Sequence, residues 1–183
     1  MPAMEITTTS RLRLRTLEHS DDAFIMELVN DPLWLRFIGD RNVHSLPAAR
    51  GYIDKVRDGY AKHGFGLWAV ERLPDGALAG LCGLLKRDSL EDPDVGFAFL
   101  PAFRGQGLAS EAVATTLELA RTRHALARVL AITDIDNVAS QGVLLRAGFA
   151  FVRTQAADTD GVLLNVYQRE LAATAPPAGE GRG

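Results

Sequence analysis

The sequence predicts an α+β domain built from seven strands and about four helices. Three observations predict this class. Some segments repeat apolar residues with a period of two, and others repeat them at helical spacing. A glycine-bearing turn at residues 104–109 joins an apolar strand to a long helix. The length of 183 residues and the 47% apolar content fit a single domain over residues 1–171, followed by a tail at 172–183 that we expect to be disordered.

The N-terminal part predicts one strand and two helices. Arg and Leu alternate over residues 11–15, which is typical of a half-buried strand. Ser20 can cap a helix with an acidic first turn, and Asp31-Pro32 is expected to end it. Ser45 opens a second helix that Gly64 closes.

The rest of the chain predicts six strands and two helices. A Pro-Asp-Gly turn at residues 74–76 separates two apolar runs and indicates a hairpin. Gly148 is expected to end the last helix. In order, the expected segments are strands 67–71, 77–85 and 95–100, helix 107–124, strand 129–133, helix 137–147, and strands 149–154 and 162–169.

Composition excludes several classes of protein. The net charge of -3 comes from 20 basic and 23 acidic residues that are mixed along the chain, so we expect no nucleic-acid partner. No apolar stretch is long enough to cross a membrane, and residues 1–10 lack the features of a secretory leader. Cys82 is the only cysteine, and the four histidines lack metal-ligand spacing. We therefore expect a cytoplasmic protein without a metal, in which Cys82 is an inert buried thiol.

The glycine turn has the backbone arrangement of an anion site. A helix start leaves several N–H groups without partners, and the positive end of the helix dipole favours a bound anion. Glycines remove side chains where the main chain must approach a ligand. The residues of this turn are Arg104, Gly105, Gln106, Gly107, Leu108 and Ala109.

Two common glycine-turn families fit this segment poorly. A dinucleotide-binding turn needs a third glycine where this chain has Ser110. A P-loop needs Gly-Lys-Ser/Thr, and no lysine follows Arg87. A standard ATP site is therefore excluded.

Two spaced motifs carry a family resemblance. RGQGLA at residues 104–109, followed after the next strand by Asn137, Ser140 and Ala-Gly-Phe at 147–149, resembles the GNAT acyl-CoA N-acetyltransferases. The opening TTSRLRLRTLEHSDDAF, with Asp-Val-Gly-Phe at 94–97 and Asn-Val-Ala-Ser at 137–140, resembles the branch that includes ribosomal-protein N-terminal acetyltransferases. The resemblance implies a mixed, largely antiparallel sheet that is splayed at its centre and flanked by helices.

The resemblance also implies a cofactor site. Backbone N–H groups of residues 104–109 would bind the pyrophosphate of acetyl-CoA, and Asn137 would contact the cofactor. Phe99 and Leu100 would pair with the pantetheine arm, because a splayed strand pair exposes N–H and C=O groups that an amide-bearing arm can satisfy.

The resemblance leaves the catalytic groups open. Many relatives use a tyrosine to protonate the leaving thiolate, but this chain has Leu144 at the corresponding position. Ser140 can serve instead by donating its hydroxyl to the sulfur, although capping or packing alone would explain it. Asp94 is a candidate base or amine-binding group, with a solvated loop carboxylate as the alternative.

The resemblance implies that the acceptor binds to the segment at residues 34–44, which joins the first two helices, and to the last hairpin, as in relatives. Its candidate binding residues are Trp34, Phe37, Asp40, His44 and Trp68, with aromatic core as the alternative for the aromatic members. A site without a strong base suits an α-amine better than a lysine. The prediction is an acetyl-CoA-dependent transferase acting on a protein or peptide N-terminus. A small-molecule amine acetyltransferase and a non-catalytic acyl-CoA sensor are the alternatives, and homodimers are possible.

Overall fold

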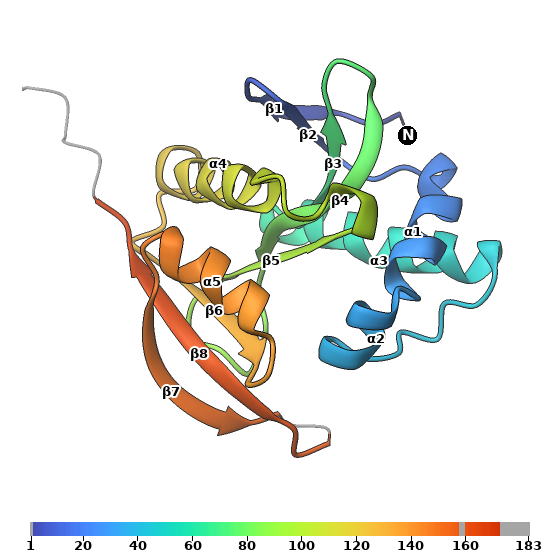
Figure 1. Cartoon of the computed structure of the whole chain (residues 1–183). Helices are drawn as coiled ribbons and strands as arrows, with labels where there is room; N and C mark the ends of the chain where they lie inside the picture. Colours follow the sequence, from blue (N-terminus) through green and yellow to red (C-terminus); the bar gives the residue numbers. More distant parts are fainter. Residues whose placement is uncertain (1, 158–159, 173–183) are drawn as a thin grey trace, which may run out of the picture.

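One mixed β-sheet organises the molecule (Figure 1). The computed structural model describes residues 2–157 and 160–172. The sheet has eight strands in the order β1-β2-β3-β4-β5-β6-β8-β7. All neighbours are antiparallel except β5 and β6. The strands are β1 (Glu5–Thr8), β2 (Leu12–Arg15), β3 (Leu67–Arg72), β4 (Ala77–Leu85), β5 (Asp94–Phe99), β6 (Arg128–Asp134), β7 (Ala150–Ala156) and β8 (Leu163–Glu170).

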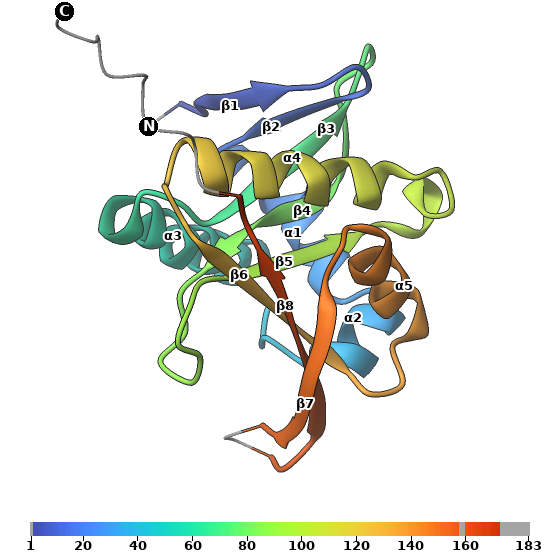
Figure 2. The same cartoon turned by 90° about the vertical axis from the view of Figure 1, so that its left-hand side faces the viewer.

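Helices cover both faces of the sheet, with α4 and α5 on one side and α1 to α3 on the other (Figures 1 and 2). Two apolar cores result. Trp68 and Val70 of β3 pack in the core that contains α4, whereas Leu67 and Ala69 pack in the core that contains α1 and α3. The central strands read as continuous apolar runs because both of their faces are buried. The helices are α1 (Asp22–Val29), α2 (Pro32–Phe37), α3 (Leu46–His63), α4 (Leu108–Thr122) and α5 (Val138–Arg146).

The predicted α+β class is confirmed, with two elements more than expected in the described residues. Strand β1 adds to the predicted seven strands. Helix α2 begins directly after α1 because the Asp31 side chain accepts a hydrogen bond from Leu33 N and Pro32 occupies the first helical turn. Asp31-Pro32 therefore ends one helix and starts the next. Residues 173–183 of the predicted tail lie outside the described residues.

Strands β5 and β6 are paired at one end only. Asp94 opposite Leu130 is the one register pair assigned to them in the described chain. Near this pair, Leu130 N donates to Pro93 O at 2.9 Å, and Arg128 Nη2 lies 2.6 Å from Asp92 Oδ2. Beyond it the two strands diverge (Figure 2). The sheet is thus splayed at its centre, and the facing backbone groups of β5 and β6 are left without each other as partners.

None of the helices in the described part of the chain combines the length and apolar composition needed to span a bilayer.

Candidate active site

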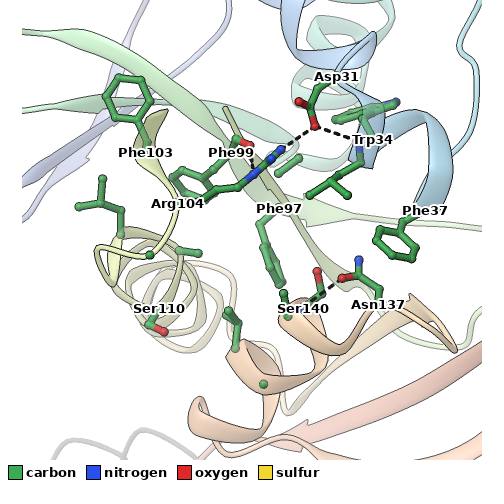
Figure 3. Close-up of a pocket in the computed structure, with 18 of the residues that line it drawn as sticks. Asp31, Trp34, Phe37, Phe97, Phe99, Phe103, Arg104, Ser110, Asn137 and Ser140 are labelled. Atoms are coloured by element: carbon green, nitrogen blue, oxygen red, sulfur yellow. Dashed lines mark hydrogen bonds and ion pairs between the residues drawn. The ribbon is translucent and has the colours of Figure 1, made fainter. Parts of the chain in front are cut away.

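A cavity of about 520 Å³ lies beside the splayed strands and is bounded by the glycine turn, α5 and α2 (Figure 3). Its residues come from three parts of the chain that are far apart in sequence. The lining residues from β5, the glycine turn and α5 include Phe97, Phe99, Arg104, Gly105, Gly107, Leu108, Ala109, Asn137 and Ser140.

The glycine turn presents unpaired backbone donors. Gly105 and Gly107 have φ values of 74° and 77°, in the left-handed region that glycine adopts readily. Gly107 is the N-cap of α4 and no side chain caps this helix. The N–H groups of residues 105–110 have no hydrogen-bond partner among the described residues, and the first donor that returns to the helix is Glu111 N. This cradle fits the pyrophosphate of acetyl-CoA, which would satisfy these donors.

The side chain of Arg104 fixes the turn to the rest of the cavity. Its Nη2 donates to Asp31 Oδ2 at 2.6 Å, and its Nε donates to Phe99 O at 3.1 Å. The same Asp31 oxygen caps α2 through Leu33 N at 3.1 Å (Figure 3). One buried carboxylate therefore holds both the α2 start and the glycine turn, and the Arg104 guanidinium is engaged within the protein.

Helix α5 supplies the polar groups of the cavity wall. Asn137 caps the helix by accepting a hydrogen bond from Ser140 N at 3.2 Å. The Ser140 hydroxyl lines the cavity and has no hydrogen-bond partner among the described residues. Leu144 is fully buried in the core and can donate no proton. A donor aimed at the cavity from α5 is therefore available at Ser140.

Helix α2 supplies the apolar wall. Leu33, Trp34 and Phe37 of α2 line the cavity, together with Ile38, which directly follows the helix. Figure 3 shows Phe37 next to Asn137. Of the lining residues in the described chain, Asp31 alone carries a carboxylate, and it is already paired with Arg104.

Known proteins share this sequence pattern and this fold. The family model described as "Acetyltransferase (GNAT) domain" matches residues 11–150. This chain is a GNAT acetyltransferase. The N-acetyltransferase YoaA of Bacillus subtilis, itself uncharacterized, is 26% identical over 145 residues, which are 79% of this chain and 82% of YoaA.

Solved structures show the same fold for the acetyltransferase. An acetyl transferase from Salmonella typhimurium, described as modifying the N-terminal serine of ribosomal protein L7/L12, superposes with a TM-score of 0.77 at 19% identity, covering 92% of this chain and 100% of that one. A RimL ribosomal L7/L12 α-N-protein acetyltransferase in complex with coenzyme A gives a TM-score of 0.71 at 19% identity, with 93% and 100% coverage.

Asp94 does not reach the cavity of the acetyltransferase. Its side chain is 1% exposed, and both of its oxygens accept from Arg87 Nε at 3.1 and 3.2 Å. Burial raises its pKa to about 6, against the opposing effect of Arg87. The solvated-carboxylate alternative is wrong, and the structure offers Asp94 no contact with the cavity through which to act as a base.

Other predicted residues also lie away from the cavity. Trp68 is 2% exposed and belongs to the core, and Leu100 is buried. The Gln106 side chain donates to Ala102 O at 2.9 Å, outside the lining, whereas its backbone N–H belongs to the cradle. His44 Nε2 and Asp40 Oδ1 lie 3.3 Å apart on the surface. Of the predicted acceptor residues, Trp34 and Phe37 are the two that the structure brings to the cavity.

Several lining residues were not predicted. Asp31 was interpreted only as part of a helix stop, and its ion pair with Arg104 spans 73 positions of sequence. Phe97, Phe103 and Arg146 also line the cavity. Phe97 lies two residues before Phe99 on β5, and residues two apart in a strand share one face of the sheet. This spacing could have predicted that Phe97 lines the cavity with Phe99. Arg146 follows Asn137 and Ser140 on the α5 face and offers a cation on that wall.

Metal ligation and the Cys82 thiol were the other two chemistries that the sequence raised. In residues 2–157 and 160–172, no group of three His, Cys, Asp or Glu side chains is placed to hold a metal ion. Burial raises the pKa of the Cys82 thiol to about 12, and its Sγ lies 3.3 Å from Thr116 Oγ1 in the core. A thiolate nucleophile at Cys82 is therefore unfavourable.

Proposed function

We propose that this acetyltransferase moves the acetyl group of acetyl-CoA to the α-amine at the N-terminus of a protein or peptide. The amine attacks the thioester directly. The observation that carries the proposal is the charge of the cavity lining. Its ionisable side chains in the described chain are Asp31, Arg104 and Arg146, and the single carboxylate is already paired.

This lining favours an amine that needs little help to lose its proton. An α-amine has a pKa of about 7.7–8.0 and a lysine about 10.4, so deprotonating the lysine costs about 3–4 kcal/mol more. A cavity without a free base fits the α-amine. A polyamine or an aminoglycoside carries several cations, and cavities for such substrates need several carboxylates that the described lining does not provide.

The placement of backbone and side-chain groups suggests how the cofactor is bound and how the thiolate leaves. The N–H groups of residues 105–110 bind the pyrophosphate, and the free edge of β5 near Phe99 pairs with the pantetheine arm. Acetyl-CoA supplies the acetyl thioester. As the C–N bond forms and the C–S bond breaks, the Ser140 hydroxyl donates a hydrogen bond to the departing sulfur, passes its proton to it and takes up the proton that the attacking nitrogen loses. Asn137 holds the start of α5, where Ser140 lines the cavity.

One structural neighbour suggests an acceptor to test first. The Salmonella protein is described as modifying a ribosomal N-terminal serine, but at 19% identity it supports the fold more than the acceptor. Its acceptor is a reasonable first candidate for this chain.

A screen of amines read by mass spectrometry tests the proposal. Purified protein with acetyl-CoA would be offered N-terminal peptides, including one from ribosomal protein L7/L12, together with spermidine and kanamycin. We expect acetyl groups on peptide α-amines, with one thiol released per acetyl group transferred. Acetylation of spermidine or kanamycin with every peptide inert would replace this function by the small-molecule alternative. Acetyl-CoA binding without turnover on any amine would favour the sensor.

A further inference from the structure

The mouth of the cavity is apolar on both sides. On α2, Leu33 and Ile38 line the cavity and are 42% and 41% exposed. On α5, Val138 also lines the cavity and is 73% exposed. Exposed apolar side chains that face one another across a cavity are surface that a bound apolar group would remove from water.

The deeper part of the same wall is aromatic. Phe37 and the buried Trp34 continue the α2 face inward (Figure 3). The only carboxylate of the described lining, Asp31, accepts from Arg104 and from Leu33 N. A basic side chain next to the reacting amine would therefore meet no unpaired carboxylate in the described lining, and its desolvation would be uncompensated.

Resting on the proposed function, we infer that the acceptor carries an apolar side chain at its first or second residue, which packs against Leu33, Phe37 and Ile38. The amine beside it then points toward the thioester and Ser140. This class of acceptor excludes peptides that begin with two basic residues. The side chain contributes through burial of apolar area, so we expect selectivity to appear in kcat/KM for the acceptor.

A matched peptide panel tests the inference. Hexapeptides with one common tail would differ at positions 1 and 2, carrying Val, Met, Leu or Phe in one set and Lys or Arg in the other, with 2-phenylethylamine and spermidine as non-peptide controls. We expect kcat/KM to be at least about ten-fold higher for the apolar set. Acetylation of peptides without this preference would overturn the inference and leave the proposed function intact. Acetylation of spermidine alone would overturn both.

Helix α2 offers a closely matched pair of variants. Leu33 and Leu35 are 42% and 40% exposed on the same helix, but Leu33 lines the cavity and Leu35 does not. We expect Leu33→Lys to lower kcat/KM for an apolar peptide at least about ten-fold at an unchanged KM for acetyl-CoA, and Leu35→Lys to stay within about two-fold of the wild type. Equal losses in both variants would show that the effect comes from α2 stability and would overturn the inference.

A separate observation concerns the charge beside the anion cradle. Glu111 lies in the first turn of α4, where its negative charge would repel a bound pyrophosphate. Two residues that precede β2 donate hydrogen bonds to the Glu111 carboxylate. Arg11 Nε donates to Glu111 Oε1 at 2.9 Å, and Thr9 Oγ1 donates to Oε2 at 2.7 Å. Burial raises the pKa of Glu111, but the hydrogen bonds from Thr9 and Arg11 hold it below its ordinary value, so Glu111 is ionised at neutral pH.

Arg11 also touches the turn itself. Its Nη1 donates to Gln106 O at 2.8 Å, and its Nη2 lies 3.4 Å from where a Cβ on Gly107 would stand. We infer that Arg11 is a positioning residue for the cofactor: it offsets the charge of Glu111 and holds the Gln106 carbonyl away from the cradle, so that the neighbouring N–H groups remain free for the pyrophosphate.

Single and double variants separate this electrostatic role from a merely structural one. By calorimetry we expect Arg11→Met to weaken acetyl-CoA binding at least about five-fold, Glu111→Gln to leave it unchanged or tighter, and the double variant to recover to within about three-fold of the wild type. The effect of Arg11→Met should shrink in high salt. Arg50→Met, which breaks an exposed pair with Asp22 away from the cavity lining, is the control. Binding weakened equally by Glu111→Gln, or unchanged by Arg11→Met, would overturn the inference.

Discussion

At the scale of single residues, Ser140 is the side chain on which the chemistry depends most. The cavity places its hydroxyl, which has no partner in the described chain, opposite the α2 wall, while Leu144 is sealed in the core. A thiolate leaves with a pKa of about 8.5, so a hydrogen-bond donor improves the step without being indispensable.

We expect Ser140→Ala to lower turnover at least about ten-fold, equivalent to about 1.4 kcal/mol in the barrier, at an unchanged Kd for acetyl-CoA. Ser140→Thr keeps a hydroxyl and should retain most of the activity. Steady-state kinetics and calorimetry on the three proteins provide the measurement. A Ser140→Ala enzyme with wild-type turnover would leave Ser140 with a packing role only.

Asp94 is the residue for which the sequence alone was least informative. Its position before the central strand indicated either a base or a solvated carboxylate, whereas the fold buries it beside Arg87 at the closed end of the β5 and β6 pair. Burial is a property of the whole assembled sheet, and no local pattern encodes it.

The raised pKa of Asp94 predicts a pH-dependent stability. Its pKa is about 6 in the folded protein and about 3.9 in an unfolded chain, so the folded state binds the proton more tightly and stability falls as pH rises from about 4 to about 6. The loss is at most about 3 kcal/mol. Asp94→Asn should flatten the pH dependence of urea unfolding in this window and keep turnover within about two-fold of the wild type. A turnover loss beyond about ten-fold would instead restore the catalytic prediction for Asp94.

At the scale of elements, the glycine turn and α4 form the part of the site that the sequence predicts best. The turn depends on local chemistry: glycines where φ is positive, and a helix start with free N–H groups. Helix α2 shows the opposite case. Asp31-Pro32 can end a helix or begin one, and the outcome depends here on the Leu33 cap and on Arg104, which lies 73 residues away.

Gly107 gives a direct test of the turn. Gly107→Asp places a β-carbon at a φ of 77° and a negative charge in the path of the pyrophosphate. We expect acetyl-CoA binding to weaken at least about 100-fold by calorimetry. Gly76→Asp is the matched control, because Gly76 has a φ of 72° in the hairpin between β3 and β4 and meets no heavy atom within 4 Å. Undiminished binding in the Gly107→Asp protein, with folding verified by circular dichroism, would place the anion site elsewhere.

At the scale of the whole molecule, the site lies where two parts of the sheet meet. Strands β1 to β5 form one part and β6, β8 and β7 the other, and the cavity lies beside their divergence. The order of elements could be predicted from the chain because each element has its own period. The partners of each strand could not, since pairing joins residues such as Asp94 and Leu130 that no local pattern connects.

Hydrogen exchange measures how the cofactor acts on this junction. We expect acetyl-CoA to slow amide exchange in Phe97, Phe99 and residues 105–110, because their free N–H groups gain partners. The edge strand β7 lies away from the cavity and should exchange at the same rate with and without acetyl-CoA, which makes it an internal control. Protection spread evenly over the sheet would contradict binding at the splayed strands.

The one-ended pairing of β5 and β6 also gives the molecule a mechanical property. The five residues of β5 that follow Asp94 extend about 17 Å from the pair, so a rotation of about 5° there moves the far end by about 1.5 Å. A displacement of about 1 Å between reacting groups can slow a reaction about 100-fold. The ion pairs of Arg87 and Arg128 lie at the paired end of the two strands. A small shift in the angle between β5 and β6 at this end therefore produces a larger displacement at the open end, where the acetyl group must meet its amine.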